Sequence, residues 1–145
     1  MYNSLIHKRD YMLCFEFQYL NHASLLLEIK QENQTQGVRI LFDPWLSGTA
    51  FSESWGLRYN NPNAYDLAAT ADVLWISHWH SDHFHPPTLQ EIAKRNPKMR
   101  VLANVSKNFS MAERLTGFGF ENVEPFLERK WCEVAPDVKL VRIPT

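Results

Sequence analysis

The sequence predicts an α/β (α+β) fold built around a β-sheet. In the first half, strand-like segments follow one another, whereas from position 72 an apolar strand, a loop, a helix and another strand alternate. Of the 145 residues, 45% are hydrophobic, 21% charged and 13% aromatic, which is typical of a globular domain with a substantial core. Because no internal repeat, low-complexity tract or linker interrupts the chain, residues 1–145 are expected to form one domain or part of one.

Three strands are expected in the first half of the chain. They cover residues 12–20, 23–30 and 38–42, and a polar turn over residues 31–37 joins the last two. From Cys14 to Leu20, apolar and polar residues mostly alternate, as in a strand that buries one face. We therefore expect this sheet to lie against a core.

A long segment, residues 47–63, is rich in Gly, Ser, Asn and aromatic residues and has no period. Loops of this length in compact domains are often functional. Phe51, Trp55 and Tyr59 are therefore candidates to line a substrate pocket. The same aromatic residues would equally serve to pin a long loop to the surface.

The second half alternates between helices and strands. After an apolar strand at residues 72–77, a helix is expected from Pro86 to Arg95, because proline suits a first helical turn. A strand at 100–103 and a helix at 107–116, ended by Gly117, come next. Further strands are expected at 123–126, 131–134 and 138–143.

A cluster of metal-ligating side chains follows the strand at 72–77, in the order His78-Trp79-His80-Ser81-Asp82-His83. In extended backbone, residues i and i+2 point the same way, so His78 and His80 can close on one ion. Asp82 and His83 follow after the chain begins to turn, so they can serve a second, adjacent ion. The alternatives are a histidine-rich surface loop and a set of histidines hydrogen-bonded in the core.

Imidazole nitrogens with a carboxylate oxygen suit zinc, iron or manganese better than calcium or magnesium. We expect zinc, as one or two ions, with iron and manganese as alternatives. Cys14 and Cys132 lie far from the cluster and are expected to be packed or free thiols.

A divalent ion held by imidazoles lowers the pKa of bound water from about 15.7 toward 7. Asp82 is therefore the candidate catalytic residue as well as a ligand, because it can orient that water or accept its proton. The sequence thus predicts metal-activated hydrolysis of a phosphodiester, ester, lactone or amide.

The net charge of −1 comes without any basic run, which favours a small-molecule substrate over nucleic acid. The N-terminus has no apolar core of signal-peptide length, and no stretch approaches the roughly 20 apolar residues of a membrane span. A cytoplasmic protein without membrane contact is therefore expected.

The histidine cluster resembles the signature of the metallo-β-lactamase superfamily. Residues 21–28 resemble the first strand pair of that fold, and residues 40–48 resemble the strand and loop that follow it. The string that runs from Asp43 to Phe51, with Trp55 and residues 76–83 and 87–89, is similar to a narrower branch. That branch contains the CMP-N-acetylneuraminate hydroxylases and related bacterial metal-dependent hydrolases.

The resemblance implies an αββα sandwich with a one- or two-metal site at one edge of the sheets. It places His78 and His80 on the first metal and Asp82 and His83 on the second, with Asp43 supporting the ligand loop. The family normally adds a third histidine, a bridging aspartate and a last histidine from further along the chain, and none of these is found here. Residues 1–145 are therefore expected to be the first half of such a domain, or a truncated one.

Four residues are of types that could substitute for the absent ligands: His7, His22, His85 and Asp43. We expect Asp43 and His22 beside the metal ligands, where they would orient a ligand or face the substrate. The alternatives are a turn-forming role for Asp43 and a packed position for His22.

Two alternatives to a hydrolase come from other functional classes. The first is an oxidoreductase related to the sugar-nucleotide hydroxylases. Such enzymes usually also carry a Rieske domain with Cys-x-His and Cys-x-x-His ligand pairs, and neither cysteine here begins such a pair, so hydroxylation by this chain alone is not expected. The second is a truncated, non-catalytic metal-binding fragment, or a homodimer that shares ligands across its interface.

Overall fold

The computed structural model describes residues 12–105 and 110–143. The main sheet consists of β1 (Leu13–Asn21), β2 (Ser24–Gln31), β3 (Val38–Phe42), β6 (Val73–Trp75), β7 (Arg100–Asn104) and β8 (Asn122–Phe126). The helices are α1 (Ala64–Ala69), α2 (Pro86–Arg95) and α3 (Met111–Gly117). Two hairpins are formed by β4 (Thr49–Ala50) with β5 (Trp55–Gly56) and by β9 (Trp131–Ala135) with β10 (Val138–Val141).

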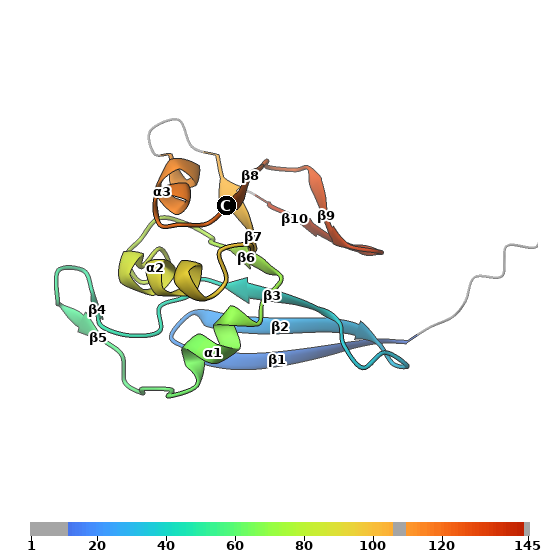
Figure 1. Ribbon diagram of the computed structural model, residues 1–145, viewed down its shortest axis with the longest axis horizontal. Helices are drawn as coiled ribbons and strands as arrows, with labels where there is room; N and C mark the ends of the chain where they lie inside the picture. Colours follow the sequence, from blue (N-terminus) through green and yellow to red (C-terminus); the bar gives the residue numbers. More distant parts are fainter. Residues whose placement is uncertain (1–11, 106–109, 144–145) are drawn as a thin grey trace, which may run out of the picture.

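The main sheet is mixed and has the strand order β1-β2-β3-β6-β7-β8 (Figure 1). The first three strands pair antiparallel, and β3, β6, β7 and β8 pair parallel. Strands β3, β6, β7 and β8 therefore end at one edge of the sheet. Because β2 is antiparallel to both β1 and β3, β1 ends at this same edge.

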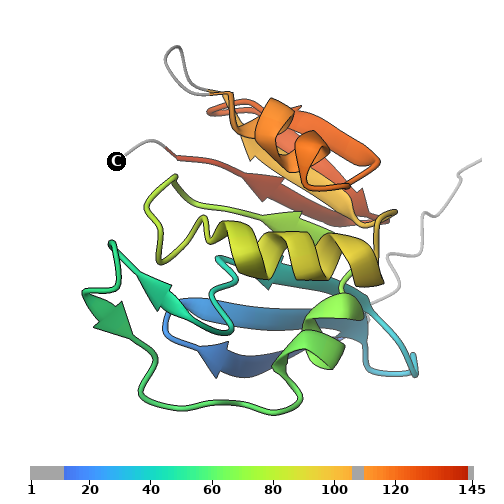
Figure 2. The same ribbon diagram turned by 60° about the vertical axis from the view of Figure 1, so that its left-hand side comes forward.

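Each face of the sheet is covered by a different layer. Figure 2 shows α1, α2 and α3 side by side on one face, with the β9–β10 hairpin behind the other. Neighbouring residues of the central strands alternate between two cores: Leu41 packs under the helices and Ile40 under the hairpin. The expected α/β fold is thus confirmed, with a helical layer, a sheet and a second β layer.

Two elements match the predicted bounds, β3 and α2. Helix α2 begins with two prolines, and the His85 side chain caps it by accepting a hydrogen bond from Thr88 N. The segment 47–63 departs from the expected irregular loop, because it contains the β4–β5 hairpin, and α1 follows it unpredicted. Helix α3 begins at Met111 with Ser110 as its cap, whereas the predicted start lies among residues 106–109, outside the described ranges.

Gly37 shows why the β2–β3 turn needs a residue without a side chain. A Cβ at this position would collide with the carbonyl oxygen of Ile29. The two strands thus approach closely just beyond the turn. Cys14 and Cys132 are both free thiols, as expected.

No helix among the described residues is long and apolar enough to cross a membrane.

Candidate metal centre

Three chain segments meet at the edge where β1, β3 and β6 end. His22 lies in the β1–β2 turn, Asp43 directly follows β3, and Ser77 and the histidine cluster follow β6. Beyond His80 the backbone turns, because the N–H groups of His83 and Phe84 both donate to the His80 carbonyl, at 2.9 and 2.7 Å. This turn carries Asp82 and His83 back toward the sheet.

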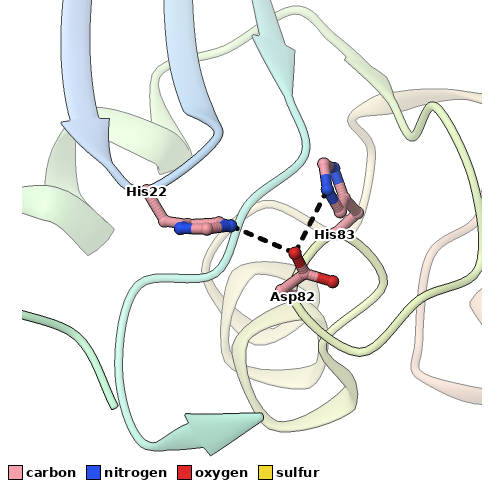
Figure 3. A group of neighbouring side chains, drawn as sticks. All are labelled: His22, Asp82 and His83. Atoms are coloured by element: carbon pink, nitrogen blue, oxygen red, sulfur yellow. Dashed lines mark hydrogen bonds and ion pairs between the residues drawn. The ribbon is translucent and has the colours of Figure 1, made fainter. Parts of the chain in front are cut away.

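Two imidazoles and one carboxylate converge at this edge (Figure 3). Nε2 of His22 lies 3.0 Å from Asp82 Oδ2, and Nε2 of His83 lies 3.3 Å from the same oxygen. One potential ligand atom from each of these residues lies within 4.8 Å of the others, which is close enough for all three to bind one ion. We call His22, Asp82 and His83 the three-donor group.

Asp82 is an ionised carboxylate with one oxygen atom that has no described partner. Burial opposes its charge, but hydrogen bonds from His22 and from the backbone N–H of Asp82, with the nearby charges of His83 and His22, hold its pKa below the ordinary value. The residue is 6% exposed, and its Oδ1 is buried without a hydrogen-bond partner among the described residues. An ionised carboxylate with an unpaired buried oxygen, beside two imidazoles, fits a divalent metal ion.

Asp43 orients one member of this group. Its Oδ2 lies 3.0 Å from His83 Nδ1, and its Oδ1 accepts from Ser77 N at 2.7 Å. An N–H at Nδ1 of His83 leaves the lone pair on Nε2, the nitrogen that faces Asp82. A carboxylate behind a histidine in this way is typical of metal sites.

His78 and His80 lie beside the three-donor group. Their ring centroids are 4.7 Å apart, and the His78 ring is 4.0 Å from that of His83. Ser77 Oγ donates its proton to Asp43 and therefore accepts a hydrogen bond from Nδ1 of His78 at 2.8 Å. Nε2 of His78 then carries the lone pair that can bind a metal ion. Burial, followed by the charges of His83 and His80, lowers the pKa of His78 and favours the neutral form that binds metal. That His78 and His80 hold the first metal stays a prediction.

Among the possible substitutes for absent ligands, His22 and Asp43 lie at the centre and His85 does not. Nδ1 of His85 faces the Thr88 hydroxyl at 2.8 Å and Nε2 faces the Thr49 carbonyl at 3.2 Å, so both ring nitrogens are occupied. Burial lowers its pKa, and the neutral ring caps α2. His7 lies outside the described residues. Ser77 was not predicted as a site residue, and only its place directly before His78 was a signal for it.

The β4–β5 hairpin contacts the ligand loop. Phe51 N donates to Ser81 Oγ at 2.9 Å, and the Phe51 ring lies 4.9 Å from that of Trp55. Of the three aromatic residues proposed to line a pocket, Trp55 borders a cavity next to His22, whereas Phe51 and Tyr59 are not among its described lining residues.

The fold and the site define an α/β protein with metal-ligating side chains gathered at one edge of its sheet. Residues 16–133 match the family described as "Beta-lactamase superfamily domain", and the chain belongs to that family. The resemblance to the metallo-β-lactamase superfamily is thereby confirmed, and both the family and the three-donor group support metal binding.

The chain is similar to several hydroxylases. It is 35% identical to the cytidine monophosphate-N-acetylneuraminic acid hydroxylase of Danio rerio over 107 residues, which are 72% of this chain and 17% of the relative. The enzyme of the same name from Asterias rubens is 31% identical over 129 residues, 87% of this chain and 19% of that one. The chain therefore spans less than a fifth of the length of these relatives.

Among solved structures, a mutant of CmlA beta-hydroxylase superposes with a TM-score of 0.65 and 25% identity. The match covers 90% of this chain and 24% of the other. The narrower branch expected from the sequence is thus confirmed.

These comparisons contradict the predicted hydrolase. The relatives and the structural neighbour are named as hydroxylases, which are oxidoreductases. The prediction was wrong because the spacing of donors specifies imidazole and carboxylate ligands, which zinc and iron share. The ligand pattern therefore does not distinguish a site that activates water from a site that oxidises its substrate. Because zinc was expected together with hydrolysis, its prediction is no longer supported. The family and the hydroxylase relatives still support the prediction of an enzyme.

Proposed function

We propose that this chain contributes the metal centre of a metal-dependent hydroxylase, related to the sugar-nucleotide hydroxylases, that oxidises a small-molecule substrate. The observation that carries the proposal is the three-donor group. Two histidines and one carboxylate form the ligand pattern of many non-haem iron oxygenases. The names of the relatives point to the same class of reaction.

The metal we propose is iron, because zinc has no redox chemistry under biological conditions. Bound iron would supply the one-electron steps that reaction with dioxygen requires. Overall, one oxygen atom enters a C–H bond of the substrate and the other leaves as water, with two electrons and two protons taken from an external donor. His22, Asp82 and His83 would hold one ion, and His78 and His80 would extend the site toward a second.

The roles of individual side chains follow from their contacts. Asp82 acts as a charged ligand, and the proton-accepting role expected for a hydrolase is not carried over. Asp43 holds the proton of His83 on Nδ1, so that Nε2 stays available. Ser77 does the same for His78, through the hydroxyl that Asp43 orients. The negative charges of Asp43 and Asp82 favour the binding of a metal cation.

The test compares the chain loaded anaerobically with Fe²⁺ or with Zn²⁺. Each sample receives CMP-N-acetylneuraminate and dioxygen, with ascorbate as a chemical electron donor in place of a Rieske domain, and mass spectrometry looks for a product with one added oxygen atom. We expect product only with Fe²⁺, lost in Asp82→Ala and retained in Asp66→Asn, an exposed surface carboxylate. Equal turnover with Zn²⁺, or a hydrolysed product, would reject the proposal.

A further inference from the structure

A cavity of about 280 Å³ opens next to the three-donor group. His22 belongs to both, because its ring borders the cavity while its Nε2 faces Asp82. The volume is close to the lower end, about 300 Å³, of the range for small-molecule sites. Part of a ligand bound in this cavity would therefore be separated from the metal centre only by the His22 ring.

Two indole rings form apolar walls of this cavity. Trp45 is 1% exposed and is fixed by a hydrogen bond from Nε1 to the Ser47 carbonyl at 3.1 Å. Trp55 is 51% exposed and lies on the β4–β5 hairpin. Both indoles meet the His22 ring edge-on, at 5.2 and 6.3 Å between centroids. The walls thus offer one rigid and one accessible aromatic surface for a planar or apolar ligand part.

Arg58 supplies the positive charge of the cavity. Among the described lining residues it is the one with a permanent charge, and it forms no ion pair or hydrogen bond within the described ranges. The next residue is anchored, because the side-chain amide of Asn21 donates to the Tyr59 carbonyl at 2.7 Å. An arginine without a described partner that lines a cavity together with Trp45 and Trp55, next to an anchored residue, is suited to recognise an anion.

We infer that Arg58 binds the anionic group of the substrate in this cavity, with the adjoining apolar part against Trp55. The guanidinium would pair with two oxygens of a phosphate or carboxylate in a bidentate manner. The inference rests on the proposed function, because it assigns to the cavity a part of the hydroxylase substrate. A solvated surface arginine without a ligand is the competing account, and binding measurements separate the two.

The experiment uses cytidine monophosphate and uncharged cytidine as probes, since the nucleotide is the group named in the relatives. Binding is followed by quenching of tryptophan fluorescence and checked by calorimetry. We expect the parent protein to bind the nucleotide about 10- to 100-fold more tightly than cytidine, as for a charge-assisted pair. Arg58→Gln should abolish this difference, and Arg58→Lys should retain only part of it. Lys98→Gln removes one charge from an exposed site at the opposite edge of the sheet and should change nothing.

A second arm separates Arg58 from the metal. After removal of metal by a chelator, the preference for the nucleotide should persist, because Arg58 needs no ion to bind phosphate. Loss of the preference on chelation, equal affinities in the parent and Arg58→Gln, or undetectable binding of the nucleotide would each overturn the inference. Failure of the proposed function is a separate result, namely the absence of iron-dependent oxidation in the parent protein.

Discussion

At the residue scale, His22 and Asp43 share an unusual backbone conformation. Their φ angles are +40° and +44°, in the left-handed region that few residues other than glycine occupy. Asp and His are among the side chains that enter this region most often, and such positions are frequent at functional sites. Both residues lie where a strand ends, so the sharp turn of the backbone aims the side chain at the metal centre.

Asp43 should matter to metal affinity through His83. In Asp43→Asn the amide can no longer hold the Nδ1 proton of His83 with a full charge, and we expect metal affinity to fall about 10- to 100-fold. The measurement is an Fe²⁺ titration against a competing chelator. Asp66→Asn serves as the control, because that carboxylate is exposed and pairs with Arg95 on the surface. Unchanged affinity in Asp43→Asn would leave Asp43 only the turn-forming role.

The sequence predicted the residues of the ligand loop but not how they group. The order of His78, His80, Asp82 and His83 is visible in the chain, and so is their place after a strand. The approach of His22 to Asp82 is not, because the two residues are 60 positions apart and meet only if β1 and β6 end at the same edge of the sheet. A carboxylate that spans two segments can be recognised only once the strand order is known.

At the element scale, β1 presents an exposed aromatic row. Phe15, Phe17 and Tyr19 are 57%, 61% and 68% exposed and pair across to β2 on the face that the β9–β10 hairpin partly covers. Within the described residues, β1 is an edge strand that pairs with β2 alone. An apolar row on an open edge favours association between copies.

We therefore expect this chain to self-associate through β1 in a concentration-dependent way. The double variant Phe15→Ser with Phe17→Ser should shift sedimentation velocity profiles toward the monomer, because it removes two exposed rings from one face. Tyr59→Ser, an exposed aromatic outside the sheet, is the matched control and should leave the profile unchanged. A monomeric parent at all concentrations would contradict a homodimer formed on this face.

The β2–β3 hairpin is pinned by a charged side chain. Glu28 accepts from Gly37 N at 3.1 Å and pairs with Arg39 on the neighbouring strand at 3.0 Å. Burial opposes the charge of Glu28, but these hydrogen bonds and the charge of Arg39 outweigh it, so its pKa lies below the ordinary value of 4.5. As the pH falls, the unfolded chain therefore takes up this proton before the folded chain does.

The contribution of Glu28 to stability should consequently depend on pH. It is fully present above pH 4.5 and is lost as the pH falls through the lower pKa of the folded state. Glu28→Gln should reduce the free energy of unfolding by about 1 kcal/mol at neutral pH, since Arg39 is partly exposed. Urea unfolding at several pH values measures the difference, with Glu121→Gln as an exposed control. A gap between parent and Glu28→Gln that stays constant into strong acid would refute this account.

The sequence located elements with a clear local signal better than elements without one. Strand β3 is apolar except for Arg39 and follows a polar turn, and α2 has prolines at its start and a buried face, so both were placed correctly. Helix α1 has only six residues, and its N-cap, Asn63, makes no side-chain capping hydrogen bond. The β4 and β5 strands have two residues each, and such elements exist through tertiary contacts such as that of Phe51 with Ser81 rather than through local preference.

At the scale of the whole molecule, the metal centre joins parts of the fold that are distant in sequence. His22 belongs to the antiparallel half of the sheet, whereas Asp82 and His83 follow β6 in the parallel half. An ion bound by all three would tie the halves together. Because such a site does not exist in the unfolded chain, metal binding must stabilise the folded state.

Fe²⁺ should therefore raise the melting temperature of the chain. At a free-ion concentration about 100 times the Kd, binding adds about 2.7 kcal/mol, which for a domain of this size corresponds to a shift of about 5–10 °C. Anaerobic calorimetry with Fe²⁺ measures it, and Ca²⁺ is the control ion because it prefers sites made only of oxygen. The shift should disappear in Asp82→Ala. It should also shrink in His22→Asn, where asparagine tolerates the left-handed backbone and so preserves the turn. If His22→Asn kept the full shift while His80→Ala lost it, the ion would be bound by His78 and His80 instead. The metal would then not connect the two halves of the sheet.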